Sequence, residues 1–167
     1  MNIHSNIHTV GYEGLALADF LRQLRRARVQ IVVDVRDLPL SRKRGFSKTA
    51  LAAALDGAGM AYLHVRSLGC PKPIREQYRK NKDWNAYTAA FMDHMRQQTT
   101  AVAELAALCE ARAAALLCYE ADARFCHRTY VARAVAALTG GSVLHLGAAG
   151  VTPDRAIAVA AQADGSR

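Results

Sequence analysis

The amino-acid sequence predicts an α/β domain of three layers, in which helices cover both faces of a mostly parallel sheet of about five strands. Three observations predict this class. Short β-type runs alternate with stretches of helical periodicity, the length of 167 residues suits one domain, and 51% of the residues are apolar, which is enough for a core. No internal repeat or low-complexity linker divides the chain, so residues 1–167 are expected to form a single domain.

The expected strands are short runs of aliphatic and β-branched residues at 7–10, 30–35, 61–65, 114–118 and 143–146. The second run is the most informative, because a continuous β-branched segment is typical of a parallel strand buried on both faces. Strands that alternate with helices in this way indicate a doubly wound, Rossmann-like sheet with right-handed crossovers.

The helices between these strands are predicted from apolar residues that recur with a period of 3.6. Ser47 is the expected N-cap of the second helix, residues 83–111 are expected to form one long helical region, and the last helix stops at Gly140. Residues 66–82 are expected to be a long connection of the kind that can act as a lid, and a short helix is expected after Pro153 within the tail 150–167. The apolar stripes are Leu17, Phe20, Leu21 and Leu24; Leu51, Ala54 and Leu55; Tyr87, Phe91 and Met95; and Val131, Ala134, Val135 and Leu138.

The charge and the cysteines of the chain indicate its possible partners and its expected cellular location. Lys and Arg exceed Asp and Glu by 22 − 14 = 8, and the excess is concentrated in residues 22–48 and 66–82. Such an excess indicates either a solvated basic surface or an anionic partner, from phosphate to nucleic acid. We expect no membrane span and no signal peptide, and the four cysteines do not resemble a disulfide scaffold, so the expected location is the cytoplasm.

The polar residues gather after the expected strands. In open α/β sheets, ligands bind beyond the carboxyl ends of the strands, so these residues are the candidates for a functional site. They are Tyr12 and Glu13 after the first strand; Asp34, Arg36, Ser41, Arg42 and Arg44 at and after the second; His64 at the third; and Cys118, Glu120, Cys126, His127 and Arg128 at and after the fourth.

A helix is expected to begin at Cys126, where unpaired backbone N–H groups and the helix dipole favour a thiolate. The alternative is a cysteine that packs beneath the helix, with His127 as a structural neighbour. Glu120 is either a general base or a tether for the loop, and Cys118 is either reactive or a small core residue. We expect no closed zinc site at Cys118, Cys126 and His127, because the cysteines are not spaced as Cys-x2-Cys pairs, and we assign no metal ligands. An open site that includes His64 stays an alternative.

The basic residues after the second strand also have two interpretations. Arg36 can hold an anion through two hydrogen bonds, or it can pair with Asp34 or Asp37 and stiffen the loop. The cations at 42–44 precede Gly45 and Phe46, and cations beside an aromatic ring suit a phosphate-bearing or single-stranded ligand.

Five segments of the sequence, in consistent order over about residues 7–147, resemble the bacterial and archaeal family called domain of unknown function 488. They are Thr9-Val-Gly-Tyr-Glu-Gly14; Asp34-Val-Arg-Asp-Leu-Pro-Leu-Ser41; Gly45-Phe-Ser47; Tyr62-Leu-His64 through Leu68-Gly69; and Leu116-Leu-Cys-Tyr-Glu120 to Cys126-His-Arg128. The resemblance implies a compact α/β protein and no defined activity. The chain departs from the family at Cys70, where a glycine is frequent, and at Ala16, where a helix-capping residue is frequent.

These observations lead to three hypotheses for the function. The first is an enzyme that acts on a phosphate-bearing small molecule or a nucleic acid, with Arg36, Arg42 and Arg128 holding the anion. Cys126 is then the nucleophile or thiolate, and Glu120 or His127 transfers protons. The second is a nucleic-acid or nucleotide-binding module without catalysis, and the third is thiol redox or sulfur transfer through Cys118 and Cys126. The sequence indicates no particular cofactor and no oligomeric state.

Overall fold

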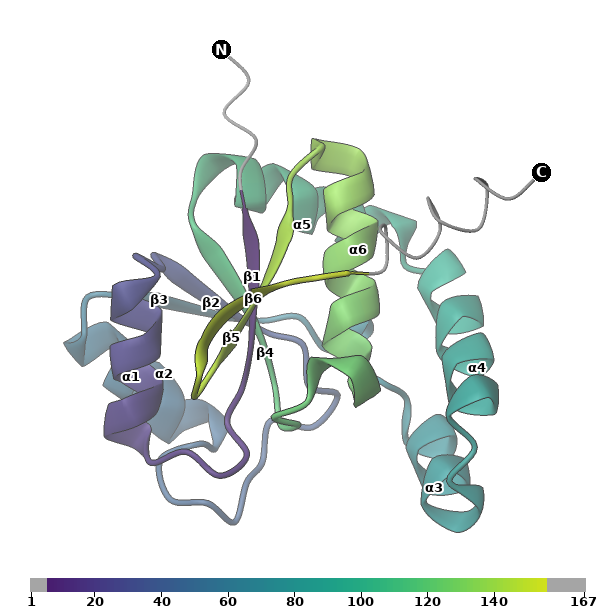
Figure 1. Ribbon diagram of the computed structural model, residues 1–167. Coiled ribbons are helices and arrows are strands. Elements are labelled where there is room, and N and C mark those ends of the chain that lie inside the picture. Colours follow the sequence, from purple (N-terminus) through teal and green to yellow (C-terminus); the bar gives the residue numbers. More distant parts are fainter. Residues whose placement is uncertain (1–5, 156–167) are drawn as a thin grey trace.

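The protein is described by a computed structural model that covers residues 6–155 (Figure 1). Within that range one sheet of six strands runs in the order β3-β2-β4-β1-β5-β6. The first five strands are parallel and β6 is antiparallel to β5, which confirms the expected mostly parallel α/β sheet with one strand more than expected. The strands are β1 Ile7–Gly11, β2 Ile31–Asp34, β3 Ala61–His64, β4 Ala114–Cys118, β5 Val143–Gly147 and β6 Gly150–Pro153.

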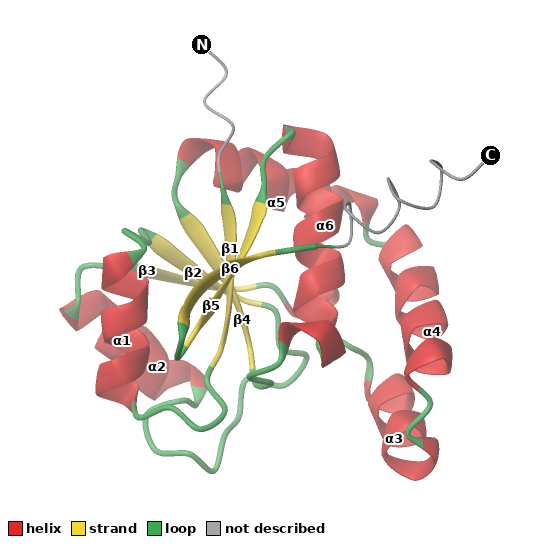
Figure 2. Ribbon diagram, viewed as in Figure 1, coloured by secondary structure: helices red, strands yellow, loops and turns green. Residues whose placement is uncertain are grey.

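Helices cover both faces of the sheet and complete a three-layer arrangement (Figure 2). One face packs against α1 (Leu17–Arg26) and α2 (Lys48–Gly57), while the other packs against α4 (Trp84–Arg96), α5 (Thr99–Ala111) and α6 (His127–Thr139). Strand β4 serves both cores, because its side chains alternate between the two faces. Leu116 joins the core beneath α4, α5 and α6, and Leu117 joins the core beneath α1 and α2.

Local sequence signals explain how several helices begin and end. The Asp83 side chain accepts a hydrogen bond from the backbone N–H of Ala86 and caps α4. Gly140 ends α6 with φ of 72°, a left-handed conformation that glycine adopts at little cost. Helix α1 follows Ala16, which makes no side-chain capping bond, in keeping with its departure from the family pattern.

The region 66–111 differs from the expectation. The expected long connection at 66–82 is instead a 3-10 turn (Arg66–Leu68) followed by α3 (Lys72–Asn81), which lies beside α4 (Figure 1). The predicted helical region 83–111 is two helices, α4 and α5, that are separated at Gln97 and Gln98. No residue of α3 is fully buried. Its sequence therefore has no continuous apolar stripe, which is the pattern that predicts a helix.

Ser47 occupies the N-cap position of α2, as expected, but its side chain makes no capping bond, because its hydroxyl exchanges hydrogen bonds with the backbone of Ser41. Residues 150–153 form β6, a fully exposed edge strand that was not expected from the sequence. The helix expected after Pro153 falls mainly on residues 156–167, outside the described range. No described helix is both long and apolar enough to cross a lipid bilayer.

Candidate functional site

The carboxyl ends of β1, β2 and β4 lie side by side, because β4 pairs with both neighbours in parallel. The connection from β4 to α6 brings four reactive side chains together at this edge. We call Cys118, Glu120, Cys126 and His127 the edge cluster. Cys118 ends β4, Cys126 is the N-cap of α6, and His127 is the first residue of that helix, as expected from the sequence.

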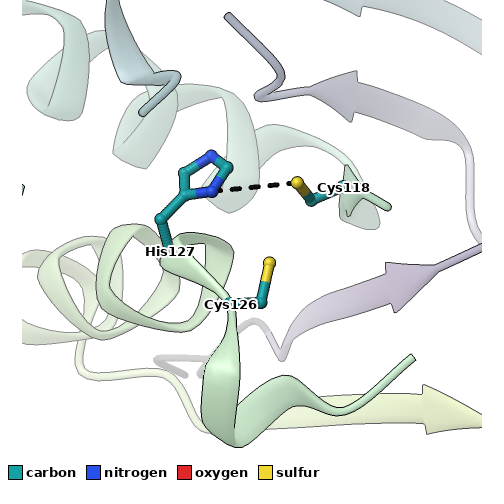
Figure 3. Close-up of side chains that lie close together, drawn as sticks. All are labelled: Cys118, Cys126 and His127. Atoms are coloured by element: carbon teal, nitrogen blue, oxygen red, sulfur yellow. Dashed lines mark hydrogen bonds between the residues drawn. The ribbon is translucent and has the colours of Figure 1, made fainter. Parts of the chain in front are cut away.

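The sulfur atoms of Cys118 and Cys126 and Nδ1 of His127 lie within 4.8 Å of one another (Figure 3). The Sγ of Cys118 is 3.7 Å from Nδ1 of His127, and all three residues are buried. Both cysteines are free. Three polarisable ligand atoms therefore share one small, buried space.

The orientation of the His127 ring is set by the strand beside it. Its Nε2 lies 2.7 Å from the carbonyl oxygen of Val35, which can only accept a hydrogen bond. The Nε2 atom therefore carries a proton, and Nδ1 is left to face the two sulfur atoms. Phe91 packs edge-on against the ring, with 5.2 Å between ring centroids, and holds it in place.

Cys126 and Glu120 form the closest polar pair of the cluster, with 3.1 Å between Sγ and Oε2. Burial and the neighbouring charge of Cys126 raise the pKa of Glu120 to about 7. Burial opposes ionisation of Cys126, but the hydrogen bond from Cys118 and the charges of Arg128 and His127 outweigh it and lower the pKa of the Cys126 thiol well below its usual range. The ionisation of Glu120 therefore depends on that of Cys126.

The other two members of the cluster respond to Cys126. The hydrogen bond to Cys126, with burial, raises the pKa of Cys118 well above its usual range, so Cys118 stays protonated and donates. Burial alone would lower the pKa of His127, but its contact with Cys126 raises it. The cluster thus has one acidic thiol that is surrounded by proton donors.

Arg128 lies directly beneath the cluster and is 0% exposed. Its guanidinium donates hydrogen bonds to Oγ1 of Thr9 and to the carbonyl oxygens of Glu120 and Ala121. These contacts hold the loop after β4 against β1, so in this structure the side chain supports the loop and does not face the solvent.

A cavity of about 450 Å³ opens at the carboxyl edge of the sheet and reaches the edge cluster. We call it the edge cavity. Its floor includes Cys118, Glu120 and His127, and its walls come from the segment after β2, from α3 and α4, and from the loop after β4. Its other lining residues are Tyr12, Arg36, Asp37, Leu38, Leu40, Ser41, Arg42, Cys70, Arg75, Tyr78, Arg79, Lys82, Trp84, Tyr87, Tyr119 and Phe125.

Cations and aromatic rings dominate the wall of the edge cavity. Arg42, Arg79 and Lys82, which we call the cationic rim, are exposed and form no ion pair with any described residue. Arg75 pairs with Asp37, yet its buried Nε has no hydrogen-bond partner among residues 6–155. The wall therefore offers several donors to an anion.

The aromatic side of the wall is built around Trp84. Its ring stacks on that of Tyr87 with 4.5 Å between centroids, and Tyr78 and Phe125 meet it edge-on at 5.5 Å. Phe125 and Tyr119 are each 47% exposed, so ring surface remains open beside the cationic rim. An arrangement of this kind can hold a flat ring and a charged group at the same time.

The side chains of Asp34 and Arg36 lie on the face of the sheet that packs against α1 and α2. Nε and Nη2 of Arg36 donate to the two carboxylate oxygens of Asp34 at 2.8 and 2.6 Å, and Nη1 donates to the hydroxyl of Tyr12 and the carbonyl oxygen of Phe46. Of the two interpretations given for Arg36, the structure shows the ion pair with Asp34. Arg36 also lines the edge cavity.

The structure brings together nine of the thirteen residues expected at the site, seven of them in the lining of the edge cavity. Tyr12, Arg36, Ser41, Arg42, Cys118, Glu120 and His127 line the edge cavity, and Cys126 and Arg128 lie just behind its floor. Arg44 is exposed and does not line it, and His64 contacts the backbone of Arg36 instead. Glu13 accepts a hydrogen bond from the backbone N–H of Ala121, which makes Glu13 the loop tether that was considered for Glu120.

Sequence reasoning did not assign several lining residues to the site. Cys70, Arg75 and Tyr87 lie on segments that were expected to be a loop or an ordinary helix face. The run of basic and aromatic residues from 75 to 84 was a usable signal, because a helical period places Arg75, Tyr78, Arg79 and Lys82 on one side.

The fold and the site together define a doubly wound α/β protein with a cysteine–histidine–glutamate cluster at the carboxyl edge of its sheet. The chain belongs to the family described as Domain of unknown function DUF488, whose model matches residues 16–135. The match includes the whole edge cluster and ends within α6. A search of curated proteins and a search of solved structures each gave no match.

Proposed function

We propose that this protein is an enzyme that acts on a phosphate-bearing small molecule or a nucleic acid bound in the edge cavity. The observation that carries the proposal is that one cavity joins the edge cluster to the cationic rim. Reactive groups on the floor and unpaired cations on the wall are the two parts that a phosphate-bearing substrate requires.

The charge of Arg75 supports the same conclusion, because this residue lines the edge cavity and its side chain is partly exposed. Its buried Nε has no hydrogen-bond partner among the described residues and carries a desolvation cost. The stacked rings of Trp84 and Tyr87 add a flat apolar surface, which suits the base of a nucleotide. We therefore favour substrates that carry both a phosphate and an aromatic ring.

Within the edge cluster, Glu120 lines the cavity, and its Oε2 lies 3.1 Å from Sγ of Cys126. We assign it to proton transfer, with His127 as the second candidate for that role and Cys126 as the group whose charge Glu120 controls. Turnover of a bound substrate should then be lost in Cys126→Ser and in Glu120→Gln. Unchanged turnover in both variants would refute these roles.

Binding in the cavity can be measured without knowing the reaction, because Trp84 is the sole tryptophan of the sequence and lines the cavity. Inorganic phosphate, adenosine monophosphate and a short single-stranded oligonucleotide would be titrated while the emission of Trp84 is followed. We expect a saturable change with the monophosphate or the oligonucleotide. If none of the probes changes the emission, the proposed substrate class is wrong.

Variants that remove one positive charge distinguish binding at a specific site from general electrostatic attraction of an anion. Arg79→Gln and Lys82→Gln should each weaken binding by about tenfold or more, as expected for one lost charge-assisted hydrogen bond. Arg25→Gln is the matched control, since Arg25 is an exposed cation near the far end of α1 and the substitution changes the net charge equally. Equal weakening in all three variants would indicate nonspecific attraction.

A nucleic-acid-binding module without catalysis is the second candidate. The exposed rings of Tyr119 and Phe125 favour it, because they lie beside the cationic rim where unpaired bases can stack. Its signature is an oligonucleotide affinity that falls steeply with salt, while no probe is turned over. Binding that is insensitive to salt would exclude this candidate.

Sulfur transfer or thiol redox chemistry is the third candidate, and the proximity of the Cys118 and Cys126 sulfurs favours it. Mild oxidation should then form a Cys118–Cys126 disulfide, which peptide mass mapping would detect. We expect the protein to act in the cytoplasm, because free cysteines persist in a reducing compartment.

A further inference from the structure

Three atoms of the edge cluster are arranged as the ligands of a metal ion. In a tetrahedral zinc site with Zn–S of about 2.3 Å and Zn–N of about 2.0 Å, neighbouring ligand atoms lie about 3.5–3.8 Å apart. The Cys118 sulfur and Nδ1 of His127 are 3.7 Å apart, and the Cys126 sulfur completes a triangle in which no side exceeds 4.8 Å. An ion at the centre needs only a small contraction of this triangle.

The surroundings also match those of a metal site. Histidines that bind metals usually donate their second ring N–H to a carbonyl or carboxylate, which fixes the ring and its tautomer. His127 does so at 2.7 Å to the carbonyl oxygen of Val35, and this bond aims Nδ1 at the sulfurs. Cys126 is held at the first turn of α6 and Cys118 at the last position of β4, so both ligands sit on rigid elements.

Charge and access are consistent with a soft divalent cation. Two buried thiolates are costly unless a cation neutralises them, and two sulfurs with one imidazole are ligands that zinc prefers. Cys118 and His127 line the edge cavity, as does Glu120, while Cys126 lies behind them. A three-ligand site next to a cavity leaves its fourth position for water or substrate.

We propose that Cys118, Cys126 and His127 bind a Zn²⁺ ion whose fourth position faces the edge cavity beside Glu120. The proposal rests on the function proposed above in one respect, because it names the cofactor of the same site. Cys126 is then a ligand, and its thiolate charge acts through the metal. Glu120 keeps its place next to the open position.

The test uses Co²⁺ as a spectroscopic substitute for Zn²⁺. Chelator-treated full-length protein would be titrated with Co²⁺ and then with Zn²⁺. We expect one equivalent of Co²⁺ to produce thiolate charge-transfer absorption in the near ultraviolet and strong tetrahedral bands in the visible, both of which Zn²⁺ removes. Binding without the charge-transfer absorption, or no binding at equimolar concentration, would overturn the proposal on the wild-type chain alone.

Cysteine variants locate the site. Cys118→Ser and Cys126→Ser should each weaken Zn²⁺ binding by more than about 100-fold, since even loss of an outer partner costs about 10–100-fold. Cys109→Ser is the matched control, because Cys109 is equally buried but packs in the core under α5. If the control loses as much affinity as the other two, or if neither of the other two loses any, the assignment is wrong.

The metal proposal and the functional proposal fail in different ways. Titration of adenosine monophosphate against Trp84 emission in the chelator-treated protein tests the cavity without the metal. Phosphate binding that survives while Co²⁺ fails to bind overturns only the metal site. Co²⁺ binding without any response to phosphate-bearing probes supports the metal site and overturns only the proposed substrate class.

Discussion

Arg36 and Asp34 form a buried ion pair with two hydrogen bonds, in which side chains only 6% and 0% exposed meet at 2.6 Å. Because the two remaining contacts of the guanidinium go to Tyr12 and Phe46, the pair connects the end of β2 to the segments after β1 and before α2. The ion pair therefore gives Arg36 a structural role, in addition to its place in the lining of the edge cavity.

Asp34→Asn should therefore lower the free energy of unfolding by about 3–5 kcal/mol, because it leaves a buried guanidinium without its counter-charge. Urea unfolding followed by far-ultraviolet circular dichroism measures this change. Arg44→Gln in the next loop is the control, since that side chain is exposed, and its effect should stay within about 0.5 kcal/mol. A loss below about 1 kcal/mol in Asp34→Asn would contradict this structural role.

Gly11 holds β1 close to the loop that carries Glu120. A Cβ atom at this position would lie 1.8 Å from the carbonyl oxygen of Glu120, so alanine forces the loop outward. We expect Gly11→Ala to cost at least about 2 kcal/mol, as overpacking does, and to weaken Co²⁺ binding at the cluster.

Gly57 supplies the control for this backbone contact. It ends α2, and a Cβ atom there meets nothing within 4 Å. Gly57→Ala should be neutral or should stabilise the protein by about 0.5–1 kcal/mol, since alanine favours a helix. Equal stability losses for the two variants in thermal unfolding would refute a specific role for Gly11.

Arg128 should behave as a structural residue and not as an exposed anion receptor. Arg128→Met keeps the length of the side chain but leaves the carbonyl oxygen of Glu120 without its donor and removes one of the two side-chain hydrogen bonds of Thr9. Each buried group left unpaired costs about 1–3 kcal/mol, so we expect a loss of at least about 2 kcal/mol. If Arg128→Met keeps wild-type stability but loses phosphate binding, Arg128 is a ligand-binding residue instead.

The pair of Asp154 and Arg133 predicts a pH effect on stability. The hydrogen bonds from Arg133 hold the pKa of Asp154 below its usual range. A depressed carboxylate pKa contributes stability above the unfolded value of about 3.9, and this contribution is lost as the pH falls through the folded pKa. The partly exposed pair should contribute on the order of 1 kcal/mol at neutral pH.

The free energies of unfolding of the wild type and Asp154→Asn should therefore differ most at pH 6–7 and converge below about pH 3, toward the folded pKa. Asp56→Asn, at an exposed aspartate without an ion pair among the described residues, provides the comparison. If the wild type and Asp154→Asn differ equally at every pH, the carboxylate is not the source of the effect.

The sequence predicted those elements that have a buried face. The β-branched run from Ile31 and the apolar stripe of α6 identified β2 and the last helix, since burial imposes a clear pattern. Helix α3 and strand β6 escaped prediction because α3 is rich in polar and charged residues and β6 is a strand of only four residues, all exposed. The split between α4 and α5 was also missed, because the two glutamines at the break are ordinary helix residues.

The candidate site was predictable where it depends on topology. Parallel strands carry their carboxyl ends to one edge, so Cys118 and Cys126 could be expected together from their place after β4. The approach of Cys118, Cys126 and His127 to one another could not be predicted from their spacing. Seven residues separate the two cysteines, and His127 follows Cys126 directly. The buried contacts of Arg36 and Arg128 also depend on which face each side chain takes, and sequence distance does not reveal this.

The edge cavity is assembled from segments that are far apart in the sequence. All four residues of the edge cluster lie between Cys118 and His127, on a single strand-to-helix connection, whereas Trp84 and most of the cationic rim lie on or beside α3 and α4. Under the proposed function, chemistry and recognition are encoded in separate stretches of the chain. Changes in α3 and α4 would then alter which molecule is bound while leaving the edge cluster intact, so related proteins that share the cluster need not share a substrate.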